Sequence, residues 1–215
     1  LLEEKHIYDT YCNLIMKEAD NGMNQVLVNR PVLEEYIRRQ YPGFKLISST
    51  TKRITGLDGL LEELNKDYFL VVLDYDLNHN EEVLSAIGKQ ADKVEILVNE
   101  ICYPGCPKRS EHYRQQSQMQ LEYDIDAAFP CPNKTRERKF EECKERPSFI
   151  SREQIREYAD RGFVNFKIVG RGMPMDFVKE SYLYYLVKDD SRAFIRNKME
   201  STLNQFAQAM KKRKA

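Results

Sequence analysis

The sequence alternates short apolar segments with segments long enough to form helices. Each apolar segment is followed by one helix-length stretch, which is the order of βα units with parallel strands. Residues 68–73 are apolar without interruption, as expected for a strand that is covered on both faces. We therefore expect one parallel sheet, with strands in chain order at Val26–Val28, Leu46–Ile47, Leu70–Leu73, Ile96–Val98 and Phe166–Val169.

This pattern predicts an α/β fold that resembles a TIM-like (β/α) barrel. Five strands, or six with a weaker segment at 123–127, fall short of the roughly eight strands and ~250 residues of a closed barrel. We expect the barrel to be formed by residues 1–188 and to lack strands on its N-terminal side. Residues 189–215 are expected to form a C-terminal helix and a basic tail. The alternative is an open doubly wound sheet, but no Gly-rich phosphate turn follows any strand.

Composition excludes some classes of protein. The 34 Lys and Arg residues balance 34 Asp and Glu residues, which gives no support to bulk binding of a polyanion. Mean hydropathy is −0.65, and no apolar run approaches the ~20 residues of a membrane span. Five cysteines without a secretory marker favour a reducing compartment, so we expect a cytoplasmic protein.

Polar residues gather where the predicted strands end. In a parallel barrel the carboxyl ends of the strands share one rim, so we expect these side chains to open onto one cavity. The segment 74–78 alternates carboxylates and could bind a divalent cation or supply an acid/base pair, although turn formation and helix capping explain it as well. The rim candidates are Asp74, Asp76, Asn78, Asn99, Lys167 and Arg171.

The cysteines form the sharpest pattern in the chain. Cys102 and Cys106 flank a Pro-Gly turn, and Cys131 and Cys143 follow. Four thiols suffice for a [4Fe–4S] cluster or a structural zinc, although the spacing is not the C-x2-C of a zinc ribbon. Inert loop thiols are the alternative. Cys12 lies in an amphipathic segment and is expected to be a core thiol.

Arg109 and His112 lie three residues apart at the start of the helix predicted after the cysteine loop. Residues at this spacing share one face of a helix. The pair could bind an anion or move a proton, or it could simply brace that helix. His112 could also replace one cysteine as a metal ligand.

Two segments resemble signatures of the peptidase U32 (collagenase-like) family. One motif is resembled by residues 97–109 (LVNEICYPGCPKR) with His112. A second motif is resembled by residues 165–171 (NFKIVGR). Weaker matches lie at Arg30-Pro31 with Tyr41-Pro42 and at Leu73-Asp74 with Leu77-Asn78. The resemblance spans about residues 24–187, in the order of the family.

The resemblance implies a TIM-like barrel and, in several relatives, a [4Fe–4S] cluster held by four cysteines. Such relatives act in prephenate-linked RNA hydroxylation or oxygen-independent ubiquinone hydroxylation, whereas the founding name is protease. We expect a cluster-binding protein that acts in a modification or hydroxylation reaction, with zinc as the alternative metal. The expected ligands are Cys102, Cys106, Cys131 and Cys143; the expected catalytic residues are Lys167, Arg171, His112 and Asp74; and the expected substrate contacts are Asn78, Asn99 and Arg109.

Two other functions stay open. A U32-type peptidase is the first, although the sequence shows no Ser-His-Asp or His-Glu-x-x-His arrangement, and His112 with Cys106 is the only available Cys–His pair. A non-enzymatic barrel that binds a small anion or a peptide is the second. The substrate class — small molecule, RNA or peptide — and assembly into homo- or hetero-oligomers are left open by the sequence.

Overall fold

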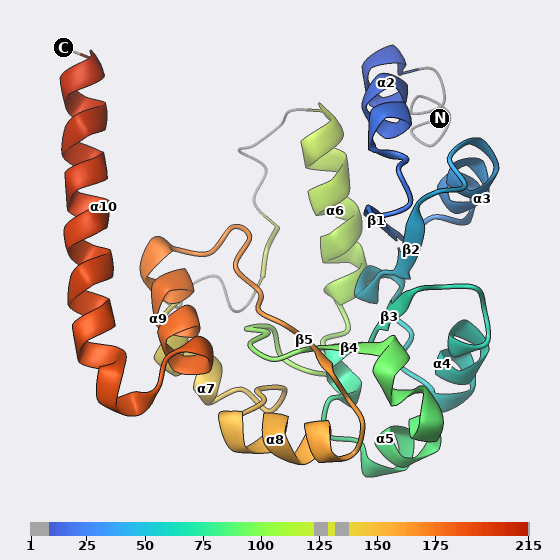
Figure 1. Cartoon of the computed structure of the whole chain (residues 1–215). Helices are drawn as coiled ribbons and strands as arrows, with labels where there is room; N and C mark the ends of the chain where they lie inside the picture. Colours follow the sequence, from blue (N-terminus) through green and yellow to red (C-terminus); the bar gives the residue numbers. More distant parts are fainter. Residues whose placement is uncertain (1–8, 123–128, 132–137, 215) are drawn as a thin grey trace.

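The computed structural model describes residues 9–122, 129–131 and 138–214 (Figure 1). Its centre is a five-stranded parallel sheet in the order β1-β2-β3-β4-β5. The prediction of parallel strands in chain order is therefore confirmed. The weak strand predicted at 123–127 lies outside the described residues. The strands are β1 Gln25–Val28, β2 Lys45–Ser48, β3 Leu70–Val72, β4 Val94–Leu97 and β5 Asn165–Lys167.

The mixed α/β fold is compatible with a barrel-like arrangement, and β1 and β5 form the two edges of the described sheet. Helices separate the strands. The α-helices are α2 Thr10–Ala19, α3 Pro31–Gln40, α4 Leu57–Leu64, α5 Glu81–Ile87, α6 Arg109–Glu122, α7 Phe140–Lys144, α8 Arg152–Asp160, α9 Met175–Leu186 and α10 Arg192–Lys214; the short 3-10 helices are η1 Thr50–Lys52, η2 Tyr75–Leu77, η3 Gly88–Lys93 and η4 Asp189–Ser191.

Local sequence signals account for several helix ends. Pro31 opens α3, where its missing N–H costs no hydrogen bond. The Asn80 side chain accepts a hydrogen bond from the backbone of Val83 and caps α5. Ser151 and Gln154 form the capping box that the sequence predicts at the start of α8.

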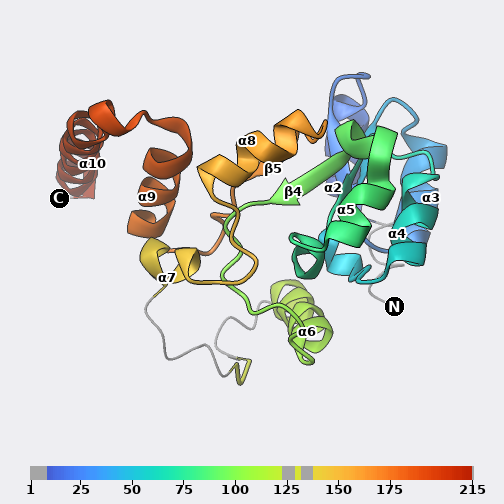
Figure 2. The ribbon, with the colours of Figure 1, turned by 90° about the horizontal axis from the view of Figure 1, so that it is seen from below.

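The two faces of the sheet differ. On one face a large apolar core lies between the strands and helices α3, α4, α5 and α8, with Leu60, Val71, Ile96 and Tyr158 among its buried residues. The other face, called the inner face below, carries a smaller buried cluster of Ile47, Leu70, Val72 and Leu97. Figure 2 shows α6 on the opposite side of β4 from α8. This division follows from the alternation of side chains along each strand.

The C-terminal part packs beyond the end of β4. The Tyr185 hydroxyl of α9 lies 2.9 Å from the carbonyl oxygens of both Val98 and Ile150, which ties α9 to the loop after β4. After η4, the first part of α10 contacts α9 through the ion pairs of Arg196 with Glu180 and of Glu200 with Lys179, and the rest of α10 extends away from the sheet (Figure 1). No helix in the described part of the chain is long and apolar enough to cross a lipid bilayer.

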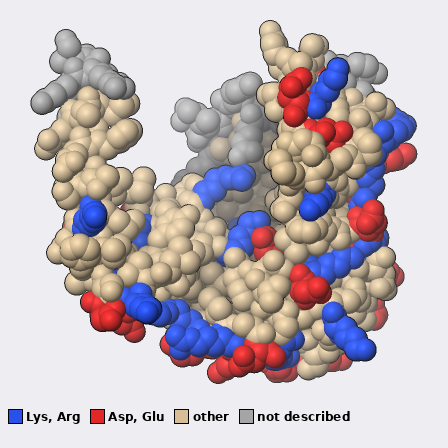
Figure 3. All heavy atoms as spheres, viewed as in Figure 1, with Lys and Arg blue, Asp and Glu red and all other residues tan. Residues whose placement is uncertain are grey.

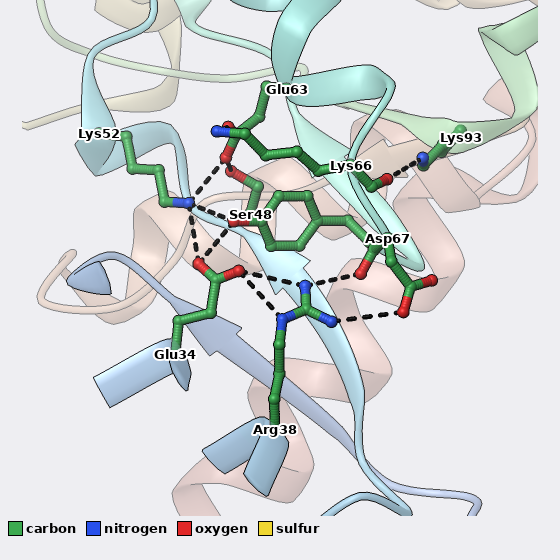
Figure 4. Close-up of polar contacts among 9 residues, drawn as sticks. Glu34, Arg38, Ser48, Lys52, Glu63, Lys66, Asp67 and Lys93 are labelled. Atoms are coloured by element: carbon green, nitrogen blue, oxygen red, sulfur yellow. Dashed lines mark hydrogen bonds and ion pairs between the residues drawn. The ribbon is translucent and has the colours of Figure 1, made fainter. Parts of the chain in front are cut away.

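A buried polar network lies between α3, β2 and α4 (Figure 4). Its centre is Glu63, which is 2% exposed. The Glu63 carboxylate accepts hydrogen bonds from Ser48 Oγ at 2.5 Å, Lys52 Nζ at 2.7 Å and Lys66 Nζ at 2.6 Å. The Tyr68 hydroxyl also accepts from Lys52 Nζ, at 2.7 Å. Burial alone would raise the pKa of Glu63, but these donors outweigh it and lower the pKa to about 2.

We predict that Glu63→Gln lowers the free energy of unfolding at pH 7 by about 3 kcal/mol, because the depressed pKa measures the preference of the fold for the ionised carboxylate. Since the pKa is lower in the folded than in the unfolded chain, this stabilisation is complete above about pH 4.5. It is lost as the pH falls toward 2. Urea unfolding of both proteins between pH 2.5 and 7 measures the effect.

The neighbouring exposed residue Glu62 provides the matched control. Glu62→Gln is expected to change stability by no more than about 0.5 kcal/mol at any pH. A constant difference between the wild-type protein and Glu63→Gln across the pH range would contradict the role given to this network.

Candidate functional site

The site begins at the end of β3, where Asp74 is buried. Its carboxylate accepts from the backbone N–H of Asp76 and from Arg53, whose Nη1 lies 2.7 Å from both carboxylate oxygens. Arg53 Nη2 lies 2.6 Å from Asp76 Oδ2, so one guanidinium bridges both acids. Arg53 adopts a left-handed backbone conformation with φ of 58°, which is uncommon for a residue other than glycine. The ion pairs with Asp74 and Asp76 hold the guanidinium over the end of β3 and offset the cost of this conformation.

Burial raises the pKa of Asp74 to about 6, although the Asp76 N–H and the Arg53 charge act in the opposite direction. The carboxylate therefore changes its charge close to neutral pH. A group with such a pKa can both take up and release a proton under physiological conditions. This is the property that a general acid or base requires.

Arg109 and its partners adjoin the cluster of Asp74, Arg53 and Asp76. Tyr75 is buried, with the guanidinium of Arg53 5.2 Å and that of Arg109 5.6 Å from its ring centre. Arg109 also lies 3.6 Å from Glu100 Oε2 and donates to the Tyr113 hydroxyl at 2.7 Å. Loop 98–108 and the first turn of α6 thus meet the end of β3. The predicted residues Asp74 and Arg109 belong to this one cluster.

Asn78 and Asn99 are fully buried and hydrogen-bonded to backbone groups. Asn78 Nδ2 donates to the carbonyl oxygens of Leu97 and Ser148, both at 2.8 Å. Asn99 Nδ2 donates to the carbonyl oxygen of Val169, and Asn99 Oδ1 accepts from its N–H at 2.6 Å. In this structure both amides connect strand ends, and their contact with a substrate stays a prediction.

Lys167 ends β5, and Arg171 lies in the turn that follows. Lys167 is opposite Leu97 in the sheet register, and its Nζ donates to Glu95 Oε2 at 2.9 Å. The pair is on the inner face, and the Lys167 side chain is 39% exposed. Arg171 is exposed in the turn that follows β5. The described contacts do not bring these two residues together with Asp74.

His112 packs against an aromatic ring. Its imidazole stacks on Phe129 with ring centres 4.5 Å apart and an angle of 8°. Burial lowers the pKa of His112, and the charges of Arg109 and Arg138 lower it further. Both effects favour the neutral imidazole. The stacking also places segment 129–131, which contains Cys131, against α6.

Two of the four predicted ligand residues contact Glu100, Cys102 through its backbone N–H and Cys143 through its thiol. The Glu100 side chain accepts from the backbone N–H of Cys102 at 3.0 Å, and Cys143 Sγ lies 3.8 Å from the Glu100 carbonyl oxygen, although 43 residues separate Cys143 from Glu100. Cys102 and Cys143 are buried, and burial raises the pKa of both thiols, that of Cys143 to about 12. Cys106 and Cys131 are partly exposed.

All five cysteines are free. Within residues 9–122, 129–131 and 138–214, no three His, Cys, Asp or Glu side chains lie close enough together to hold a metal ion. The buried hydroxyl of Tyr75 lies beside the Cys102 thiol and interacts with it, but it forms no hydrogen bond of ordinary geometry with any described residue. Buried polar atoms without a partner are rare in folded proteins.

The sequence indicates some of these residues and not others. Tyr75 and Glu100 stand within the polar strand ends but carry no pattern that marks them as site residues. Arg53 follows η1, and its left-handed backbone conformation could not be predicted, because no glycine or asparagine marks that position. Tyr113 lies one helical turn after Arg109, which is the spacing at which two side chains touch on a helix.

We predict that the Asp74 carboxyl group titrates near pH 6 in the folded protein. Burial raises the pKa of Asp74 above its value in the unfolded chain, so the protonated carboxyl group stabilises the folded protein. This stabilisation is complete below about pH 4. It falls as the pH rises through 6. The free energy of unfolding of the wild-type protein relative to Asp74→Asn should therefore drop by about 2–3 kcal/mol between pH 4 and 7.

Carboxyl carbon NMR combined with urea unfolding measures both quantities. Asp76→Asn is the matched control, since it removes the other acid that Arg53 contacts while Asp74 remains. Titration of Asp74 near its ordinary value of about 4 would contradict the effect of burial.

Comparison with known proteins gives one distant relative. The chain is 27% identical over 184 residues to a protein of Methanocaldococcus jannaschii that is named an uncharacterized protease. The match covers 82% of this chain and 54% of the relative, so the chain spans about half the length of the curated relative it matches. No protein-family description and no solved structure matches the chain. The word protease in the relative's name is also the founding name of the family that the two sequence motifs resemble.

Proposed function

We propose that this protein is a U32-like enzyme whose cysteine loop holds a [4Fe–4S] cluster and which acts in a modification or hydroxylation reaction. The ligands would be Cys102, Cys106, Cys131 and Cys143. Such a cluster supplies single-electron transfer. A small molecule or an RNA is the expected substrate class.

The observation that carries the proposal is the buried Tyr75 hydroxyl beside Cys102. Its polar neighbour is the Cys102 thiol, a weak acceptor, and a sulfur atom of a bound cluster or a ligating Cys102 thiolate would be a much stronger one. A second support is the approach of Cys143 to Glu100, which lies two residues before Cys102. The donor set is also suitable, because four cysteine thiols, here three in loop segments and one on the short helix α7, are the usual ligands of a [4Fe–4S] cluster.

We propose roles for the charged residues around the cysteine loop as well. Asp74 would take up and release a proton at its carboxylate, because its pKa lies near 6. Arg109, whose Nε has no partner among the described residues, would orient an acceptor group of the substrate. Lys167 on the inner face and the exposed Arg171 are proposed as further substrate contacts. A reducing compartment such as the cytoplasm suits five free thiols.

The test is metal and sulfide analysis of anaerobically purified protein. We expect about four iron and four sulfide per chain, with broad absorbance near ~400 nm. Cys102→Ala, Cys131→Ala and Cys143→Ala should each lose the iron, whereas Cys12→Ala, which alters a thiol on α2 outside the proposed site, should retain it. Stoichiometric zinc in place of iron would support a structural metal site and contradict the cluster.

Tyr75→Phe tests the carrying observation separately. This variant should still bind iron, but the midpoint potential of the cluster should fall, because a hydrogen bond to a cluster sulfur favours the reduced state. An unchanged potential would remove Tyr75 from the site even if the cluster is present.

A peptidase is the second candidate, and the name of the distant relative favours it. His112 and Cys106 are the residues that would carry it. Cleavage of gelatin or casein that is lost in His112→Ala and Cys106→Ala, in protein without iron, would support the peptidase and contradict the cluster enzyme. Absence of both metal and turnover would leave a binding module.

A further inference from the structure

A buried arginine lies beside the cysteine loop without an acid to neutralise it. Arg146 follows α7 and is only 5% exposed. Its guanidinium carbon lies 4.0 Å from the centre of the Tyr103 ring. Its Nε has no hydrogen-bond partner, and no carboxylate of the described residues forms an ion pair with it. Because a buried charge is strongly unfavourable unless an opposite charge faces it, Arg146 requires an anion.

Both ends of the Arg146 side chain belong to the cysteine site. The backbone N–H of Arg146 donates to the carbonyl oxygen of Cys143 at 3.0 Å, in the turn that ends α7. Cys143 is fully buried, and its thiol lies 3.8 Å from the carbonyl oxygen of Glu100. At the other end, the guanidinium stacks on Tyr103, which directly follows Cys102. The charge of Arg146 is therefore held between the segments that carry two of the proposed ligands.

The two buried thiols each respond to one arginine. Burial and the charge of Glu100 raise the pKa of Cys143, whereas the charge of Arg146 lowers it. Burial likewise raises the pKa of Cys102, and the charge of Arg109 lowers it. Each arginine thus favours the thiolate, which is the form that binds a metal.

The two arginines differ in their other contacts. Arg109 lies 3.6 Å from the Glu100 carboxylate and donates to the Tyr113 hydroxyl, so an acid already offsets its charge. Arg146 has the face of the Tyr103 ring instead. An aromatic ring attracts a cation, but it does not satisfy the five N–H donors of a guanidinium. Arg146 therefore supplies a positive charge near Cys143 that the described side chains do not neutralise.

Exposed charges do not supply a comparable effect. The chain has 34 basic and 34 acidic residues, and Figure 3 shows basic side chains beside acidic ones on the face that it draws. Salt largely screens exposed charges at distances beyond roughly 10 Å, whereas a buried charge is screened much less. A guanidinium that is buried beside a buried thiol therefore acts on that thiol more strongly than the exposed cations do.

We propose that Arg146 is a positioning residue that compensates the negative charge of the iron–sulfur cluster and raises its reduction potential. This inference rests on the proposed function. A [4Fe–4S] core held by four thiolates is an anion, and its reduction adds one electron and therefore one further negative charge. A fixed positive charge favours the more negative, reduced state. Arg146 binds no iron and acts through its charge alone.

The test is a reductive titration of the anaerobically purified full chain, with dithionite as the electron donor, followed by absorbance and electron paramagnetic resonance. Arg146→Gln removes the charge. It should shift the equilibrium about tenfold toward the oxidised cluster, which lowers the midpoint potential by about 59 mV. Arg146→Lys keeps the charge and should retain most of the wild-type potential.

Lys144→Gln is the matched control. It removes a positive charge from the residue next to Cys143, but the Lys144 ammonium lies 5.1 Å from the ring centres of both Phe140 and Tyr184, and the side chain is 38% exposed. The redox equilibrium should therefore change by less than about twofold. A shift as large as that of Arg146→Gln would contradict a specific role for Arg146.

The possible outcomes separate this inference from the proposed function. A wild-type protein that binds no iron would overturn both. Iron at the wild-type level in Arg146→Gln with an unchanged midpoint potential would overturn the inference and leave the cluster in place. If Arg146→Gln loses its iron, Arg146→Lys decides: iron retained in that variant supports the need for the charge, and iron lost there as well overturns it.

Discussion

The candidate site depends on the way two buried asparagine amides hold the ends of the strands. Asn78, just beyond β3, reaches the last residue of β4 and the loop before α8. Asn99, just beyond β4, exchanges two hydrogen bonds with Val169, which follows β5. Three strand ends are thereby fixed to one another by side chains with no exposed surface. Loss of either amide would leave buried backbone groups without partners, which costs more than the hydrogen bond itself is worth.

The two buried carboxylates, Glu63 and Asp74, have pKa values shifted in opposite directions. Around Glu63, three donors surround one carboxylate, and the pKa falls to about 2, so this network is a permanent ion cluster that binds α3, β2 and α4 together. Around Asp74, burial prevails over the single guanidinium of Arg53, and the pKa rises to about 6. The first arrangement fixes a charge, whereas the second leaves it able to change. For this reason we assign the proposed proton transfer to Asp74 at the end of β3, and a contribution to stability to the Glu63 network at the end of β2.

Much of the scaffold could be predicted from sequence. Continuous apolar strands, Pro31, Asn80 and the Ser151–Gln154 box are local signals, and local signals specify strands and helix starts. The meeting of Arg53 with Asp74 and of Cys143 with Glu100 could not be predicted, because it depends on tertiary contacts between segments 21 and 43 residues apart. Lys167 illustrates the same limit. Its position at a strand end was visible, but its pairing with Glu95 follows from the register of β4 and β5.

The order of the strands has a consequence for how the chain folds. Strands β1 to β4 pair with neighbours that lie close in sequence, so this part of the sheet can form through short loops. The last strand is different, because the contact between Asn99 and Val169 joins residues 70 positions apart. Such a contact forms slowly, because closing the long loop costs chain entropy before the contact stabilises the fold. The contact of Arg53 with Asp74 can thus form in a chain whose fifth strand is still unpaired, whereas the Asn99 amide gains its backbone partners only when β5 docks, and the inner-face pair of Lys167 and Glu95 would be among the last native contacts to form.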